Sequence, residues 1–337
     1  MKYSDIDFNT KTILITGGAG FIGSSLAFHF QENYPDCTIV VFDKFRSGRT
    51  LSNGNLESFG TYKNLIGFSG IVISGDINDS DALNNLETSY NFDYIFHEAA
   101  ISDTTVSEQD LMIRTNVNAY ENLLKIALKH DASMIYASSA ATYGDSDTFE
   151  VGHESPNNVY GFSKLMMDNI SKKYISNKCS VSIVGLRYFN VYGQREFYKN
   201  KTASTVIQFA HQILAGNAPK LFEGSDKILR DFVYIEDVIQ ANIKACLPKK
   251  SGVFNVGTGK ARSFQDISDI VQKELNTSYK TEYIPNPFIG QYQFFTQAVI
   301  DDTKNILGYD PKYSLEKGIK AYIPNIKEIY ESEIKND

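Results

Sequence analysis

The chain has 337 residues, enough for one large α/β unit or two closely joined lobes with a sizeable buried core. Hydrophobic residues make up 42% and charged residues 22%, and no run of 18 apolar residues is present, so the composition excludes a membrane-spanning protein. The net charge of −7 argues against a general binder of nucleic-acid backbones, and the polar, acidic start of the sequence leads us to expect a cytoplasmic protein.

Short runs of β-branched and apolar residues alternate with helical stretches through the first part of the chain. The first run, Thr12 to Thr16, leads directly into a glycine cluster, and the first helix is expected over Ile22 to Glu32. Because parallel strands need a connecting segment of about a dozen residues, this alternation predicts an α/β fold with a doubly wound parallel sheet. Further strands are expected over Thr38 to Asp43, Ile71 to Ser74, Tyr94 to His97, Ser133 to Ala137 and Val181 to Leu186, and further helices over Ala119 to Lys129 and Tyr160 to Asn177.

The regular alternation ends near Asn190. Beyond it we expect loops rich in Gly, Lys and Phe, mixed with helices such as Ser204 to Ala215. This change predicts a dinucleotide-binding domain over residues 1–190 and a smaller C-terminal, substrate-binding lobe over residues 191–337, with some segments of the second part returning to the first domain. No repeat or linker separates the two, so they are expected to pack as one body.

The sequence TGGAGFIG, residues 16–23, follows the first strand and opens the first helix. Its glycines, Gly17, Gly20 and Gly23, allow a sharp turn and a close backbone approach to a pyrophosphate, which the helix N-terminus also attracts. About twenty residues later, Asp43 ends the second strand, where a carboxylate can accept hydrogen bonds from the adenosine ribose. Asp76 ends the third strand and is expected either to meet the adenine edge or simply to form a turn. Together these features predict dinucleotide binding.

A second group of polar residues, Ser139, Tyr160 and Lys164, follows the glycine loop. Residues four apart share one face of a helix, so Lys164 is expected beside Tyr160, where its charge lowers the pKa of the phenol and its ammonium can bond the nicotinamide ribose. Ser139 ends the preceding strand and can bond the reacting oxygen. A tyrosine and a lysine at this spacing usually form an exposed pair, and the upstream glycine loop is what favours a catalytic interpretation.

The cysteines and histidines show no metal-ligand spacing. The sequence has no CxxC pair and no HExxH motif, so no metal site is expected and the three cysteines are expected to be reduced thiols.

Seven segments resemble the extended short-chain dehydrogenase/reductase family, and the resemblance covers nearly the whole chain. It implies a Rossmann-type sheet with a small C-terminal substrate lobe. The segments are FHEAAISDTT (96–105), YASSAATYG (136–144), NVYGFSK (158–164), RYFNVYGQRE (187–196), LFEGS (221–225), RDFVY (230–234) and QYQFFTQA (291–298).

The resemblance implies a nucleotide-sugar epimerase that converts ADP-D-glycero-D-manno-heptose to its L-glycero form during synthesis of the lipopolysaccharide core. The C6 carbinol has no acidic C–H bond, so inversion proceeds most easily by removing hydride to give a 6-aldehyde and returning it to the other face. Two faces require two proton-transfer groups. The resemblance assigns these roles to Tyr160 and Lys199, with Lys201 as the nearest alternative to Lys199, and it makes Ser139 the catalytic hydroxyl and Lys164 the group on the cofactor ribose.

The resemblance also implies the contacts of both ligands. For the dinucleotide they are Gly17, Gly20, Phe21, Ile22, Gly23, Asp43, Lys44, Asp76, Glu98, Ala99, Ala100, Ile101, Ser102, Asn116, Lys164, Val191 and Lys199. For the sugar nucleotide they are Ser139, Asn190, Lys201, Gln208, Phe222, Glu223, Gly224, Ser225, Arg230 and Tyr292.

Three other functions fit this kind of fold, and the sequence favours them to different degrees. A nucleotide-sugar dehydratase is disfavoured, because Ala140 and Ala141 stand where such enzymes carry acids. A 4-epimerase similar to the UDP-galactose enzymes, which needs no second base, is the main alternative. A non-catalytic dinucleotide sensor is a third, although it does not need the poised proton donor that Ser139, Tyr160 and Lys164 provide.

The expected cofactor is NADP, with NAD as an alternative. Asp43 favours the free ribose hydroxyls of NAD, whereas Lys44, Arg46 and Arg49 just behind it can pair with the 2′-phosphate of NADP. The family resemblance implies NADP and also a homo-oligomer, commonly a pentamer.

Overall fold

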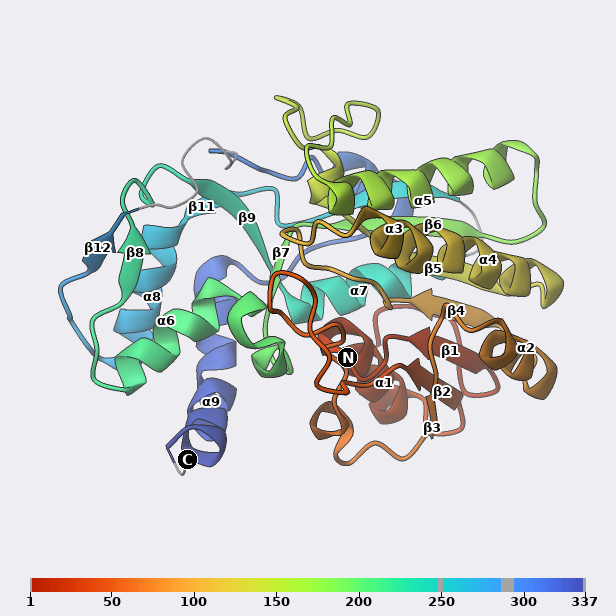
Figure 1. Ribbon diagram of the computed structural model, residues 1–337, viewed down its shortest axis with the longest axis horizontal. Coiled ribbons are helices and arrows are strands. Elements are labelled where there is room, and N and C mark those ends of the chain that lie inside the picture. The colour runs from red at the N-terminus through yellow and green to blue at the C-terminus, as the bar shows by residue number, and fades with distance from the viewer. Residues whose placement is uncertain (1, 248–250, 286–293, 336–337) are drawn as a thin grey trace.

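A parallel sheet forms the centre of the structure, a computed structural model that describes residues 2–247, 251–285 and 294–335. Within these residues the sheet has seven strands in the order β10-β6-β5-β4-β1-β2-β3, and every neighbouring pair is parallel (Figure 1). The predicted doubly wound α/β fold is therefore confirmed. The strands are β1 (Thr12–Thr16), β2 (Thr38–Asp43), β3 (Ile71–Ser74), β4 (Tyr94–His97), β5 (Ser133–Ser139), β6 (Ile183–Tyr188) and β10 (Gly252–Val256).

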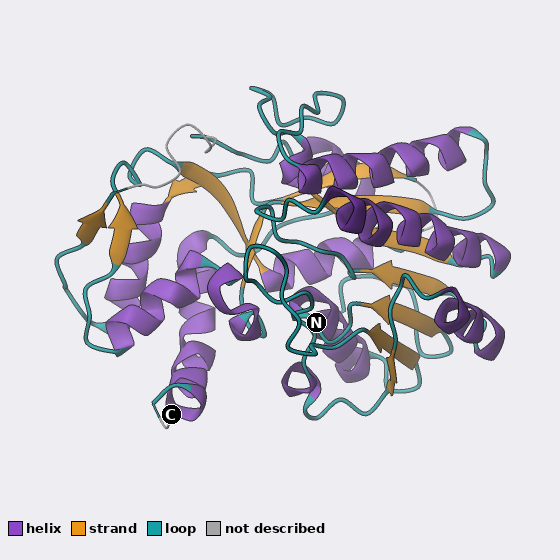
Figure 2. Cartoon of the chain, in the orientation of Figure 1, coloured by secondary structure: helices purple, strands orange, loops and turns teal. Residues whose placement is uncertain are grey.

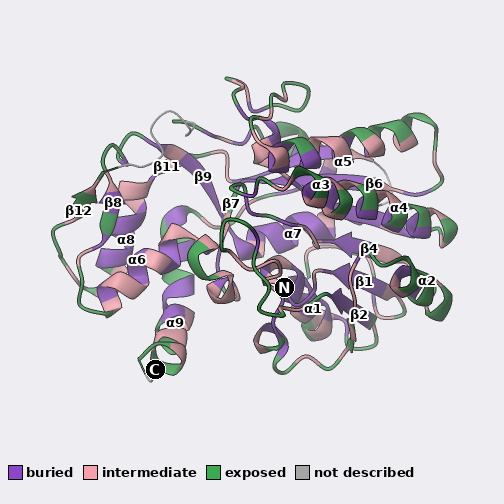
Figure 3. Cartoon of the chain, in the orientation of Figure 1, coloured by how far each residue is buried: buried purple, intermediate pink, exposed green. Residues whose placement is uncertain are grey.

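Both faces of this sheet are covered, because alternate residues of its inner strands enter different apolar clusters. Ile13 and Ile15 pack into the cluster that contains α1 and α7, whereas Leu14 between them packs into the cluster that contains α2, α4 and α5. Figure 3 shows the strands buried and the outer faces of the helices exposed. The elements of this domain other than its strands are α1 (Phe21–Asn33), η1 (Tyr62–Leu65), α2 (Ser80–Ser89), α3 (Gln109–Met112), η2 (Ile113–Asn118), α4 (Ala119–Lys129), η3 (Ala140–Thr142), α5 (Val159–Ser176) and α7 (Ile235–Ala245).

Two strands end later than the sequence predicts. We expected strands over Ser133 to Ala137 and Val181 to Leu186, but β5 continues to Ser139, and β6 starts at Ile183 and continues to Tyr188. The additional residues are polar or aromatic and lie at the carboxyl ends of the strands, where apolar periodicity gives no signal although main-chain pairing continues.

The second lobe is more regular than the loop-rich region that we predicted after Asn190 (Figure 2). Its strands have six residues or fewer. Helix α9 buries Leu315, Ile319, Tyr322 and Ile326 at helical spacing, a pattern that the sequence interpretation did not use. Strands β11, β9 and β7 form one small sheet, and β8 pairs with β12. The elements are β7 (Asn190–Tyr192), η4 (Phe197–Thr202), α6 (Thr205–Leu214), β8 (Lys220–Phe222), β9 (Leu229–Tyr234), β11 (Ala261–Ser263), α8 (Phe264–Leu275), β12 (Glu282–Ile284), η5 (Thr303–Leu307) and α9 (Leu315–Glu333).

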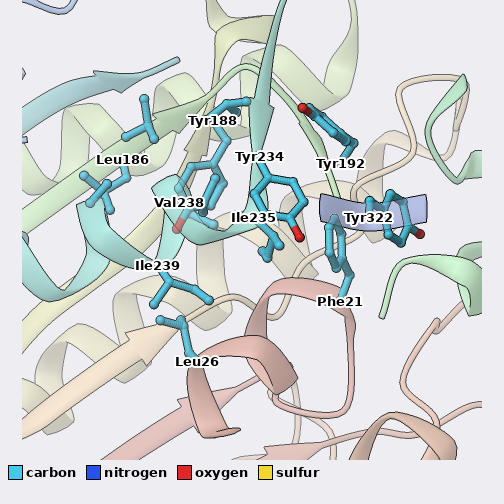
Figure 4. Packing of buried hydrophobic residues seen from close by; sticks show 14 of the residues in the cluster. Phe21, Leu26, Leu186, Tyr188, Tyr192, Tyr234, Ile235, Val238, Ile239 and Tyr322 are labelled. Atoms are coloured by element: carbon cyan, nitrogen blue, oxygen red, sulfur yellow. The ribbon is translucent and has the colours of Figure 1, made fainter. Parts of the chain in front are cut away.

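The two lobes share an apolar core. Phe21 and Leu26 of α1 lie in the same cluster as Ile235 of α7 and Tyr322 of α9 (Figure 4). After β9 the chain returns to the central sheet through α7 and β10. The division at residue 190 stays a prediction. No helix of the described residues has the length and apolar composition that a bilayer span needs.

A buried ion pair fixes α5 on the sheet. The Arg187 guanidinium of β6 donates to Asp168 Oδ2 of α5 from Nε at 3.0 Å and from Nη2 at 2.8 Å, and both side chains have no exposed surface. Tyr136 and Ser138 of β5 also donate to the Asp168 carboxylate, at 2.9 and 3.1 Å. Burial of a carboxylate costs free energy unless the carboxylate is paired and hydrogen-bonded, so these bonds fix the position of α5 on the sheet.

We expect Asp168→Ala to lower the free energy of unfolding by about 3–5 kcal/mol, because Arg187 is then buried with only Glu154 as a charged partner. Denaturant unfolding followed by circular dichroism measures the change. The matched control is Asp110→Ala, which removes an exposed pair with Arg114 and is expected to cost about 0.5 kcal/mol or less. Equal losses in the two variants would contradict the role given to the buried pair.

Candidate functional site

A cavity of about 300 Å³ opens at the carboxyl ends of the parallel strands. Ligands of open α/β sheets bind at this edge. All four predicted catalytic residues line the cavity, as do all the predicted dinucleotide contacts except Asn116. Those lining residues are Gly17, Gly20, Phe21, Ile22, Gly23, Asp43, Lys44, Asp76, Glu98, Ala99, Ala100, Ile101, Ser102, Ser139, Tyr160, Lys164, Val191 and Lys199.

The glycine turn leaves open a cradle that a side chain would fill. Gly17 has φ +69°, and a Cβ on it would lie 2.6 Å from the backbone nitrogen of Ala99. The turn delivers the chain into α1, which begins at Phe21. Free N–H groups at a helix N-terminus attract phosphate, so this part of the cavity fits a pyrophosphate group.

Asp43 ends β2 beside this turn. Its Oδ2 accepts a hydrogen bond from Ala19 N at 2.9 Å and its Oδ1 accepts one from Phe45 N at 2.8 Å. Each carboxylate oxygen has a further lone pair, so Asp43 can still accept a ribose hydroxyl while it holds the glycine turn.

Lys44 and Asp76 bond each other at the edge of the cavity. The Lys44 ammonium lies 2.9 Å from an Asp76 oxygen and 2.6 Å from Glu57. The cation predicted to meet a phosphate and the acid predicted to meet adenine therefore form one exposed network.

Asn116 lies behind the cavity wall instead of on it. Its Oδ1 accepts from Ile101 N at 2.9 Å, and its Nδ2 donates to Ile101 O at 3.0 Å and to Ser163 Oγ at 2.9 Å. Asn116 thus holds the backbone of the lining segment 98–102 against α5.

Helix α5 begins so that Tyr160 enters the cavity close to Ser139. The Asn158 side chain caps the helix by accepting from Gly161 N at 2.8 Å. A Cβ on Gly161 would lie 2.3 Å from Ala141 O, so only glycine permits this approach of α5 to the turn after Ser139. The Ser139 hydroxyl accepts from Ala141 N at 3.1 Å.

Lys164 lies one turn further along α5, and its ammonium is 5.9 Å from the centre of the Tyr160 ring. It donates to Ala137 O at 2.7 Å, and burial lowers its pKa to about 8, against the opposing charges of Glu98 and Asp168. The expectation that Lys164 lowers the phenol pKa is not met in this structure. Burial raises the pKa of Tyr160, and the influence that opposes it is the hydroxyl of Ser139.

Glu98 faces Lys164 and Tyr160 from the end of β4. Tyr188 Oη donates to its carboxylate at 2.9 Å and in turn accepts from Asn242 Nδ2 at 2.8 Å. Burial raises the pKa of Glu98 to about 7, although the bond from Tyr188 and the charge of Lys164 oppose the shift. The side chain of this residue therefore titrates close to neutral pH.

Lys199 reaches the same cavity from the second lobe. It precedes Asn200, whose φ of 54° and ψ of −124° interrupt the short helix η4. The Lys199 ammonium lies 5.9 Å from the ring centre of Phe21 in the glycine turn. Burial lowers its pKa, and the charges of Glu196 and Asp103 oppose that shift.

Apart from Ser139 at the end of β5, the predicted sugar-nucleotide contacts that the structure describes lie in the second lobe, where hydrogen bonds close two groups of them. The first joins Gln208 to Lys201, whose carbonyl accepts from Gln208 Nε2 at 3.3 Å. The second is the turn of residues 222–225, closed by a bond from the Ser225 hydroxyl to Phe222 O. Arg230 lies on β9, where it is buried and donates to Leu229 O. Asn190 is exposed on β7, and Tyr292 lies outside the described residues.

The loop between β2 and η1 also lines the cavity, and the sequence interpretation found only its start, at Lys44, and missed the rest of its lining residues. Leu51, Leu56 and residues 57–60 contribute to the wall, and a hairpin turn closes at Gly54. The pair Asn53-Gly54 is a common signal for such a turn, so the amino-acid pattern alone could have indicated this hairpin.

Residues 13–257 match the model of the NAD dependent epimerase/dehydratase family. The match extends from β1 to the end of the central sheet, over most of the chain. The chain belongs to this family. The resemblance seen in the sequence is thereby confirmed.

Members of the epimerase/dehydratase family with known names resemble this chain along nearly all of its length. ADP-L-glycero-D-manno-heptose-6-epimerase from Brachyspira hyodysenteriae is 38% identical in an alignment of 322 residues that covers 92% of this chain and 96% of that protein. The crystal structure of the enzyme of that name from Helicobacter pylori has a TM-score of 0.88 and 52% identity, covering 97% of this chain and 99% of that one. A UDP-glucose 4-epimerase from Thermotoga maritima has a TM-score of 0.82 and 27% identity, with coverages of 94% and 99%.

The raised pKa of Glu98 predicts a pH dependence of stability. Between pH 4.5, the ordinary value, and about 7 the folded chain keeps a proton that the unfolded chain releases. The parent should therefore lose stability across this window, by about 1.4 kcal/mol per pH unit at most, relative to Glu98→Gln, which cannot titrate. Denaturant unfolding of both chains at pH 5 and pH 8 measures the difference. A stability difference that is the same at both pH values would contradict the shift.

Proposed function

We propose that this chain epimerises ADP-D-glycero-D-manno-heptose at C6 to the L-glycero form. The observation that carries the proposal is the placement of Tyr160 and Lys199, from different lobes, on one cavity that also fits a dinucleotide. The relatives from Brachyspira hyodysenteriae and Helicobacter pylori, named for this epimerisation, support the choice of sugar. A 4-epimerase needs a single base, so a second poised amine favours the C6 reaction.

The residues of the chain divide the proton transfers between two sides of the cavity. When bound, the nicotinamide accepts hydride from C6 and returns it. Tyr160 and Ser139 bond the C6 oxygen of one epimer, and Tyr160 takes or gives its proton. Lys199 does the same for the other epimer. Its lowered pKa increases the neutral fraction that a base requires, and Lys164 stays available for the nicotinamide ribose.

The proposed cofactor is NADP. Lys44, Arg46 and the exposed Arg49 follow Asp43 at the end of β2. Cations at this position attract a 2′-phosphate. NAD is the alternative, which the description of the family favours.

We also propose that the second lobe binds the sugar nucleotide. Arg230, Tyr292 and the turn of residues 222–225 are proposed to hold the diphosphate and nucleotide of the sugar, because a guanidinium can bond two phosphate oxygens at once. Assembly into a homo-oligomer, a cytoplasmic location and a role in making lipopolysaccharide core heptose belong to the same proposal.

Incubation of the chain with ADP-D-glycero-D-manno-heptose and NADP or NAD, followed by nuclear magnetic resonance analysis of C6, tests the proposed reaction. We expect an equilibrium mixture of the two epimers. Tyr160→Phe and Lys199→Met should each slow epimerisation by about 10²–10⁴-fold while the chain still binds the dinucleotide, because each removes one proton-transfer group.

The control is Lys320→Met, an exposed lysine on α9, which should epimerise at the parent rate. Parent-rate epimerisation by Lys199→Met, together with loss in Lys201→Met, would transfer the second base to Lys201. Turnover of UDP-galactose without turnover of the heptose would instead establish the 4-epimerase alternative.

A further inference from the structure

Between β2 and η1 the chain leaves the sheet as a loop, residues 46–60, which we call the strap. In the sheet order β2 and β4 flank β1, the strand that carries the glycine turn. The strap starts at the end of β2, and its tip bonds the segment that follows β4. It therefore crosses over the carboxyl end of β1 and the cavity at that end, and Figure 1 shows it as the red-orange loop in the middle. Its tip is a small hairpin in which Leu51 N donates to Asn55 O at 2.8 Å.

Two carboxylates hold the tip of the strap. Glu108 Oε1 accepts one bond, from Ser52 N at 2.7 Å, and Asp103 accepts two. Asn53 and Asn55 each donate from Nδ2 to Asp103 Oδ2, at 2.8 and 2.7 Å. The other oxygen of Asp103 accepts from Thr105 N at 2.9 Å and from Thr105 Oγ1 at 2.7 Å. Asp103 is 7% exposed, so its negative charge is compensated by these four bonds, two of which exist only while the strap is down.

Apolar contact adds to these bonds. Leu51 is buried in a small cluster with Ile101, Val106, Met112 and Tyr160. A residue of the strap therefore packs in the same cluster as the proposed catalytic tyrosine. Lifting the strap would expose this cluster to water.

The base of the strap is tied to the segment that carries Lys199. Arg46 Nη2 donates to Phe59 O within the strap and to Tyr198 O of η4, both at 2.9 Å. The Lys44–Glu57 ion pair closes the base on its other side. The base is thus anchored on two sides, and the tip is the part that can swing away when its bonds to Asp103, Thr105 and Glu108 break.

We propose that Asp103 is a positioning residue that latches the strap over the cavity and so retains the dinucleotide through the complete reaction. This inference rests on the proposed function for the kind of ligand in the cavity. The proposed reaction regenerates its dinucleotide in every cycle, so it does not require the dinucleotide to be released. Release between the two hydride transfers would leave the 6-aldehyde without a hydride donor. Loading of the dinucleotide then requires the tip of the strap to open.

Release of NADPH from the loaded chain, with no sugar present, tests the latch. The fluorescence of bound NADPH is followed after mixing with excess NADP, or that of NADH with excess NAD if NADPH does not bind. We expect Asp103→Asn and the double variant Asn53→Ala/Asn55→Ala to release it about tenfold faster or more, since the double variant lacks both donors to Asp103 and Asp103→Asn loses the charge that strengthens these bonds. Asn84→Ala, an exposed asparagine on α2, should release it at the parent rate.

A second measurement follows the strap without any ligand. Trypsin should cut after the exposed Arg49 faster in both latch variants than in the parent or in Asn84→Ala. Release within twofold of the parent in both latch variants, with unchanged cutting after Arg49, would overturn the proposal. If Asp103→Asn does not fold, the double variant decides alone, because it leaves the buried carboxylate in place. A chain that releases NADPH as expected but does not epimerise the heptose contradicts the proposed function and not the latch.

Discussion

Burial of the Asp168 carboxylate against the Arg187 guanidinium seats helix α5 on the carboxyl ends of β5 and β6. Tyr160 and Lys164 lie two turns and one turn before Asp168 on the same helix, so the seating of α5 sets their depth in the cavity. A shift of the helix would separate two buried opposite charges, which is far more costly than a shift of apolar contacts. The geometry of the proposed site therefore depends on a pair that touches no ligand.

Desolvation gives the groups around the cavity their chemical character. Burial moves the pKa of Lys164 down to about 8 and that of Glu98 up to about 7, and it lowers the pKa of Lys199. Each shift favours the neutral form of its group, so protons can be exchanged near neutral pH without a metal being invoked. The strap also contributes to desolvation of the cavity, because Leu51 shields the cluster around Tyr160 from water.

The sequence predicted best what is set by local pattern and burial. Strands β1 to β4 and helix α4 have the expected bounds. Strands β1, β2 and β4 are apolar runs buried in the sheet, β3 is a β-branched run at its exposed edge, and α4 has the apolar spacing of a helix with one buried face. The spacing of four between Tyr160 and Lys164, taken together with the glycine loop upstream, predicted that both residues line the cavity, and they do. The strap latch was out of reach, since Asn53 and Asp103 are 50 residues apart in the chain and nothing local indicates their bond.

The pKa shifts and internal hydrogen bonds of the site could not be predicted from the sequence either. A lysine one turn from a tyrosine predicts a lowered phenol pKa, but in the folded chain burial dominates and raises it. Asn116 resembled a ligand contact and instead bonds the backbone of Ile101, because a buried amide must satisfy its donors and acceptor within the protein.

Transfer of hydride within a single sugar molecule is the central claim of this account. It is tested most directly with ADP-D-glycero-D-manno-heptose that carries deuterium at C6, mixed with ¹³C-labelled, undeuterated substrate and epimerised to equilibrium in ordinary water. Mass spectrometry of both epimers should find deuterium at C6 of the ¹²C sugar alone, undiminished after inversion. Loss of deuterium to water would contradict hydride return, and its appearance in the ¹³C sugar would contradict retention of the dinucleotide and the sugar through one cycle.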